Sequence, residues 1–308
     1  MSRNVPHSDP ARIRVNGIEL VYDTFGDPSA PPLLLIMGLG VQMIAWDEEF
    51  CTELAAQGFW VIRFDNRDVG LSTRLDEAGV PDVPALMQAQ AHSEAVQVPY
   101  TLRDMADDAV GLLDALQAGP AHVVGASMGG MIAQEMAIHH PERVRTLTSI
   151  MSTTGDPALP PPTPEAMSVL VTPFPTDREG YLESSVQTSR ILAGPGFPFD
   201  EDRVREEAGR AFDRGLSLAG TARQLAAILA SGSRKEALQT VTAPTLVIHG
   251  DADPLVPVQG GMDTANSIPG ARLLIIEGMG HDLPPALAPR VISAIVSHAL
   301  QERPAWSP

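Results

Sequence analysis

Residues 122–131 read His-Val-Val-Gly-Ala-Ser-Met-Gly-Gly-Met, and they carry the strongest structural signal in the chain. The apolar run predicts a buried strand, and Met131–His140 predicts a helix that ends before Pro141. A chain that passes from strand to helix over so few residues strains its central residue and needs small neighbours on both sides. We therefore expect Ser127 at the carboxyl edge of a sheet, over a helix N-terminus that favours developing negative charge.

Strands and helices alternate on both sides of this stretch. Asn16-Gly17 is a two-residue turn signal between two short strands, and the helix expected over Asp47–Gln57 ends at Gly58, a common C-terminal cap. Alternation of this kind predicts an α/β fold with a mostly parallel central sheet flanked by helices. The expected strands are Ile13–Val15, Glu19–Phe25, Leu33–Met37, Phe59–Phe64, His122–Val124, Val144–Met151, Thr245–His249 and Arg272–Ile276.

The region 153–238 differs from the rest of the chain. It opens with a proline-rich connector and continues with three patterns typical of helices, at Arg178–Leu192, Asp200–Arg214 and Leu216–Ala230. We expect residues 153–238 to form a helical cap, inserted into a core made of residues 1–152 and 239–308. The alternative is that these helices cover an edge of the sheet. The segment Asp76–Pro99 has loop character and could flank the entrance to a site.

A serine hydroxyl needs a base to take its proton and an acid to orient that base. After a strand–serine–helix turn, the acid and the base are expected in that order, each in a loop that follows a strand. Asp253 lies in the loop after the strand at 245–249 and is our choice for the acid, with Asp251 as the fallback. His281 follows the next strand and is our choice for the base.

The tetrahedral intermediate of acyl transfer requires two N–H donors for its oxyanion. We expect one from Met128, the residue after the nucleophile, and the other from Leu39, between Gly38 and Gly40. The Gly-x-Gly pattern also resembles part of a dinucleotide fingerprint. The third glycine of that fingerprint is missing, because Met43 stands in its place.

Composition excludes several classes of protein. The chain has 308 residues, a net charge of −17 and one cysteine, Cys51. Its acidic surface disfavours nucleic acid and anionic membranes, and a single cysteine cannot form an internal disulfide. No two histidines stand at ligand spacing with a carboxylate, so we expect no metal site. His249, at the end of a buried strand, is expected to be a core residue. We expect a cytoplasmic protein of unassigned oligomeric state.

The chain resembles α/β-hydrolase fold proteins from about residue 18 to residue 300. The resemblance rests on the Gly-Leu-Gly loop at 38–40, the segment Phe64–Ser72, the serine turn, Asp253-Pro254 and the Gly-Met-Gly-His segment at 278–281. Within this superfamily the chain is most similar to the branch that contains aclacinomycin methylesterase, which hydrolyses a methyl ester on a polyketide glycoside. Met37 departs from the pattern, because many members carry histidine there. Asp65 and Arg67 are expected to form a structural turn network.

These residues and the resemblance predict a serine carboxylic-ester hydrolase that acts through an acyl-enzyme, without a cofactor, on a small-molecule ester. The expected substrates are short to medium acyl esters or a polyketide methyl ester. Met37, Phe197 and Phe199 are expected to line the substrate pocket, since the two phenylalanines lie at a Gly/Pro-rich loop. A carbon–carbon bond hydrolase, a lactonase or a perhydrolase would use the same triad. A ligand receptor that keeps the fold is the non-enzymatic alternative.

Overall fold

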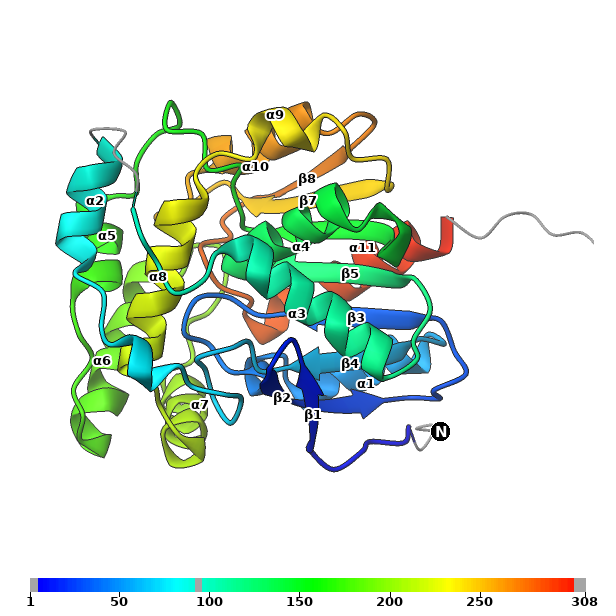
Figure 1. Cartoon of the computed structure of the whole chain (residues 1–308), viewed down its shortest axis with the longest axis horizontal. Helices are drawn as coiled ribbons and strands as arrows, with labels where there is room; N and C mark the ends of the chain where they lie inside the picture. The colour runs from blue at the N-terminus through cyan, green and yellow to red at the C-terminus, as the bar shows by residue number, and fades with distance from the viewer. Residues whose placement is uncertain (1–4, 92–95, 302–308) are drawn as a thin grey trace, which may run out of the picture.

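The computed structural model describes residues 5–91 and 96–301. Eight strands form one sheet in the order β1-β2-β4-β3-β5-β6-β7-β8 (Figure 1). The strands are β1 (Ala11–Val15), β2 (Ile18–Phe25), β3 (Pro32–Ile36), β4 (Trp60–Phe64), β5 (Ala121–Ala126), β6 (Val144–Ile150), β7 (Thr245–Gly250) and β8 (Arg272–Ile276).

The sheet is antiparallel at one edge and parallel elsewhere. The β1–β2 hairpin turns at Asn16-Gly17, where both residues have positive φ (47° and 84°), as a type I′ turn requires. Strand β2 pairs antiparallel with β4, and every further pairing is parallel. The predicted α/β fold with a mostly parallel sheet is therefore confirmed. Parallel strands place their carboxyl ends at one edge, where sites of such folds form.

Helices cover both faces of the sheet, and two buried apolar clusters lie between the layers. One face packs against α3 (Leu102–Ala115) and α4 (Met128–His139). The other packs against α1 (Glu48–Ala56) and α11 (Ala288–Gln301). All five residues of strand β3 are buried because both of its faces are covered. The remaining short elements are α9 (Lys235–Leu238), α10 (Val258–Ser267) and the 3₁₀ turns Met43–Ala45, Asp76–Ala78, Pro141–Arg143 and Pro285–Leu287.

Four of the five helices between β6 and β7 gather beside the carboxyl end of the sheet (Figure 1). Helix α2 (Val83–Ala91) packs against the last of these helices, so the segment 76–99, expected to be a loop, contains a helix. The turn residues Asp76–Pro81 made that segment resemble a loop. The cap limits at 153–238 stay a prediction. The four helices are α5 (Pro164–Val171), α6 (Arg178–Leu192), α7 (Glu201–Arg214) and α8 (Leu218–Ser231).

Two further properties concern residues 5–91 and 96–301, the part of the chain that the structure describes. No helix in this part of the chain is both long and apolar enough to cross a bilayer. Nor does this part bring together three histidine, cysteine or carboxylate side chains in a group that could hold a metal ion.

Candidate active site

The serine stands on a strained turn between β5 and α4. Ser127 has φ 55° and ψ −120°, a conformation that costs a non-glycine residue free energy and that recurs at functional sites. Close contacts with backbone atoms explain why small residues flank Ser127 in this turn. A Cβ on Gly125 would lie 2.0 Å from the Gly129 carbonyl oxygen, and one on Gly129 would lie 2.1 Å from that of Ile36. The sequence thus folds into a tight elbow that raises the hydroxyl over the start of α4.

Three side chains expected from the sequence meet at this elbow. His281 Nε2 lies 2.9 Å from Ser127 Oγ, and His281 Nδ1 lies 2.7 Å from Asp253 Oδ2. The other carboxylate oxygen of Asp253 accepts the N–H groups of Leu255 and Val256, at 2.9 and 2.8 Å. The imidazole can therefore take the serine proton at one nitrogen while the carboxylate holds its other nitrogen.

The electrostatics of Asp253 favour its ionised form. Burial alone would raise the pKa of this carboxyl group, which is 6% exposed. The charge of His281 and hydrogen bonds from His249, His281 and the Val256 N–H outweigh that effect and lower the pKa below its usual range. A carboxylate that stays ionised can stabilise the imidazolium formed during proton transfer.

The neighbouring residues Asp251 and His249 take different places. Asp251, the fallback for the acid, is exposed and accepts the Gly278 N–H at 2.7 Å, so it ties two loops together. His249, expected to be a core residue, is fully buried, and its Nε2 lies 2.8 Å from the Val256 carbonyl oxygen and 3.5 Å from Asp253 Oδ2. Its contact with Asp253 was not predicted. The available signal was its position four residues before Asp253.

The loop after β3 passes directly over the serine. A Cβ on Gly38 would lie 3.2 Å from Ser127 Cβ. The Val41 N–H donates to the Gly38 carbonyl at 3.2 Å and closes a turn around Leu39. Among the described residues, neither the Leu39 N–H nor the Met128 N–H has a hydrogen-bond partner. Two free amides beside a nucleophile are what an oxyanion requires.

The histidine loop is pressed against a segment of the cap region. The His281 N–H donates to the Leu192 carbonyl at 2.7 Å, and the Gly196 N–H donates to the Gly278 carbonyl at 2.8 Å. Asp282, the next residue, is largely buried, and burial raises the pKa of its carboxyl group to about 6. His281 therefore lies on a loop whose backbone is bonded to the end of α6 and to the segment that follows it.

The three residues expected to line a substrate pocket lie in different surroundings. Met37 is 9% exposed within the apolar cluster between the sheet and α1 and α11. Phe197 is half-buried and packs on the same cluster. The Phe199 ring lies 4.7 Å from the guanidinium carbon of Arg190 on α6, within the cap region. Their assignment to a pocket stays a prediction.

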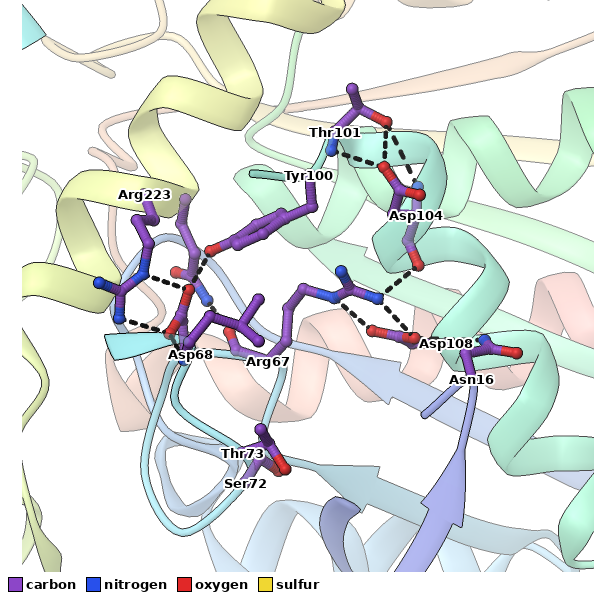
Figure 2. Close-up of polar contacts among 12 residues, drawn as sticks. Asn16, Arg67, Asp68, Ser72, Thr73, Tyr100, Thr101, Asp104, Asp108 and Arg223 are labelled. Atoms are coloured by element: carbon purple, nitrogen blue, oxygen red, sulfur yellow. Dashed lines mark hydrogen bonds and ion pairs between the residues drawn. The ribbon is translucent and has the colours of Figure 1, made fainter. Parts of the chain in front are cut away.

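The turn after β4 is a network of buried charges. Arg67 forms a bidentate pair with Asp108 on α3, at 2.6 and 2.8 Å (Figure 2). Asp65 is fully buried, accepts the N–H groups of Met43 and Leu71, and pairs with Arg214 at the end of α7. These contacts fit a structural turn network, and they extend it to α7.

Comparison with known proteins identifies the family. Residues 31–284 match the alpha/beta hydrolase fold family, so the chain belongs to this family. The enol-lactonase from Burkholderia xenovorans has the same fold, with a TM-score of 0.70 over 94% of this chain and all of that one, at 22% identity.

Two curated relatives are more informative about chemistry. Rhodomycin D methylesterase of Streptomyces peucetius is 36% identical, over 94% of this chain and 98% of its own. The 3-oxoadipate enol-lactonase 2 of Acinetobacter baylyi is 28% identical, over 84% of this chain and 85% of its own. The nearly full-length match to a methylesterase supports the predicted similarity to that branch of the family.

Proposed function

We propose that the chain is a serine carboxylic-ester hydrolase that acts on a small-molecule methyl ester. The observation that carries the proposal is the unbroken chain of hydrogen bonds from Ser127 Oγ through His281 to Asp253. The similarity to rhodomycin D methylesterase supports a methyl ester attached to a polyketide as the substrate. A cytoplasmic setting belongs to the proposal. It is supported by the single cysteine, since proteins of oxidising compartments commonly carry disulfides and this chain cannot form one internally.

The first half of the reaction forms an acyl-enzyme. Ser127 Oγ attacks the ester carbonyl carbon while His281 Nε2 takes the hydroxyl proton. The carbonyl oxygen becomes an oxyanion that the Leu39 and Met128 N–H groups stabilise. The carbon–oxygen bond to the leaving group then breaks, and His281 returns the proton to the departing alkoxide, which leaves as methanol.

The second half repeats these steps with water. His281 takes a proton from a water molecule as its oxygen attacks the acyl carbon, and a second tetrahedral intermediate uses the same two amides. Collapse of this intermediate breaks the bond to Ser127 Oγ, which regains its proton from His281. The products are a carboxylic acid and an unmodified enzyme.

The test compares wild type with Ser127→Ala. We would measure methanol release from rhodomycin D and hydrolysis of p-nitrophenyl acetate, butyrate, octanoate and laurate, together with labelling by a fluorophosphonate. We expect wild type to hydrolyse esters and to be labelled, and Ser127→Ala to do neither. Labelling of Ser127 without turnover of any ester would refute the esterase and direct attention to lactones and diketones. Absence of both would refute the nucleophile and favour a ligand receptor.

A further inference from the structure

A glutamine of the cap region reaches the loop that passes over the serine. Gln224 on α8 is fully buried, and its Oε1 accepts the Gly40 N–H at 2.8 Å. Its Nε2 donates to the Arg67 carbonyl at 2.7 Å. A backbone N–H can only donate and a carbonyl can only accept, so the orientation of the amide is fixed by its partners. One side chain thus joins α8 to the loop after β3 and to the turn after β4.

The bond to Gly40 fixes one of the two peptide planes in the turn around Leu39. The first plane contains the Gly38 carbonyl, which accepts the Val41 N–H, and the Leu39 N–H. The second contains the Gly40 N–H, which Gln224 holds. Gly40 has φ 68°, as the third position of a type II turn requires. A flip of the second plane would change ψ of Leu39 and φ of Gly40 and abolish this conformation, so the Gln224 amide opposes the flip.

Helix α8 is held in place by buried contacts, so it can fix the position of the loop after β3. Arg223, next to Gln224, forms a bidentate pair with Asp68 at 2.7 and 2.8 Å, and both side chains are fully buried. Tyr100 donates its hydroxyl to the same carboxylate at 2.7 Å (Figure 2). Burial raises the pKa of Asp68, but the hydrogen bonds from Arg223, the Leu75 N–H and Tyr100 outweigh it, and the pKa is lowered.

The backbone of α8 is also in close contact with this turn. A Cβ on Gly220 would lie 2.0 Å from the Asp68 carbonyl oxygen, and one on Gly40 would lie 2.7 Å from Thr221 Oγ1. The helix therefore touches the turn after β4 on one side and the loop after β3 on the other. The contact at Gly220 leaves no room for sliding, because packed backbones have no flexible atoms to yield. The contact at Gly40 is with the side chain of Thr221.

We propose that Gln224 is a positioning residue for the oxyanion hole. It does not touch the reacting atoms; it holds Gly40, and through Gly40 the Leu39 N–H, while the pair of Arg223 with Asp68 holds the helix. The proposal rests on the proposed function, since it assigns to Leu39 the role of oxyanion donor. Under this proposal α8 stays in one position next to the loop after β3 and does not move as a lid.

The test is Gln224→Met, which keeps the size of the side chain and removes both bonds. Fluorophosphonate labelling taken to completion counts the active sites, and kcat for p-nitrophenyl butyrate is expressed per labelled site. We expect kcat to fall by about tenfold to hundredfold with KM within about threefold, since deletion of an oxyanion donor costs roughly 10²–10³. The Ki of octyl trifluoromethyl ketone, whose adduct with serine carries the oxyanion, should rise by the same factor.

A matched control separates positioning from general stability. Gln134 on α4 is also fully buried, and its amide contacts Ser149 and Arg234. Gln134→Met should lower the melting temperature while leaving kcat per labelled site within about twofold. Hydrogen exchange of the peptide that contains Gly40 should accelerate only in Gln224→Met. An unchanged kcat per site, or an unchanged exchange rate, in folded Gln224→Met would overturn the proposal.

A second variant covers the case in which Gln224→Met does not fold. In Gln224→Glu, the protonated carboxyl group can still accept from Gly40 and donate to the Arg67 carbonyl, whereas the ionised group cannot donate. The ratio of its kcat to that of wild type should therefore fall as pH rises, and a constant ratio would overturn the proposal. If wild type hydrolyses no ester, the proposed function fails, and the exchange rates still decide whether Gln224 holds the loop.

Discussion

The backbone N–H of His281 donates to the carbonyl oxygen of Leu192 at 2.7 Å, which joins the proposed base to the end of helix α6. The surrounding contacts are between backbones. A Cβ on Gly280 would lie 2.2 Å from the Leu192 carbonyl oxygen, and one on Gly194 would lie 2.1 Å from that of Gly278. The position of the imidazole therefore depends on the cap region as well as on the sheet.

The first prediction concerns this glycine contact. Gly280→Ala should push the histidine loop away from Leu192 and lower kcat by at least about tenfold, because a displacement of about 1 Å at a reacting group can cost 10²-fold. The control is Gly119→Ala, since a Cβ there would meet no atom within 4 Å. Steady-state kinetics and melting temperatures of both variants check it. Wild-type kcat in Gly280→Ala would show that the loop tolerates the displacement.

The second prediction separates the two aspartates of one loop. Asp253→Asn should lower kcat on the order of 10³–10⁴-fold, because an amide cannot stabilise the imidazolium and favours the wrong tautomer. Asp251→Asn should lower it less than about tenfold, since the Asp251 carboxylate accepts the Gly278 N–H and an amide oxygen can do the same. The measurement is kcat for p-nitrophenyl butyrate. Equal losses in the two variants would contradict the assignment of Asp253.

The third prediction concerns the pH dependence of stability. The pKa of Asp282 is raised to about 6 in the folded protein from 3.8. The folded state therefore binds this proton more tightly than the unfolded state, and the stabilisation, fully present below pH 3.8, is lost as pH rises through 6. Asp282→Asn should gain stability relative to wild type between pH 4.5 and pH 7.5, by on the order of 2 kcal/mol. Melting temperatures at both pH values check it; a constant difference would contradict it.

The fourth prediction concerns the anchor of α8. Arg223→Met should destabilise the protein by about 3–5 kcal/mol, because it leaves the carboxylate of Asp68 buried and unpaired. Combining it with Asp68→Asn should cost less than the sum of the two changes. Arg178→Met removes an exposed pair with Asp213 and should cost below about 1 kcal/mol. Urea unfolding of the four variants and of wild type measures these losses, and equal losses in the two arginine variants would contradict the prediction.

Local sequence was sufficient to predict the sheet. Buried parallel strands are continuous apolar runs, so β3, β5 and β7 were predicted to within two residues of their observed limits. Ser127, Asp253 and His281 were predicted because each follows a strand whose end lies at the same edge. Helix α3 was not predicted, although Thr101 and Asp104 form a capping box at its start.

Contacts between distant segments could not be predicted in this way. Gln224 lies 184 residues from Gly40 in the sequence. An isolated glutamine on a helix does not indicate that its side chain will bind a backbone amide of a distant loop. The bonds from Asp65 to Arg214 and from Asp68 to Arg223 depend equally on how the cap region folds back. The sequence indicated a turn network, but not that its charges hold two cap helices.

The contact of Gly194 and Gly196 with Gly278 and Gly280 has a consequence for protein engineering. Exchanging helices α5–α8 for those of a relative would place new side chains against the loop that carries His281. That loop has no space for them, because each of these glycines faces backbone atoms within 3 Å. A chimaera should therefore inherit residues 192–196 and 278–281 from a single parent. Crossover points are better placed before residue 192 and after residue 281, so that the substrate specificity of a donor can be transferred without displacing His281.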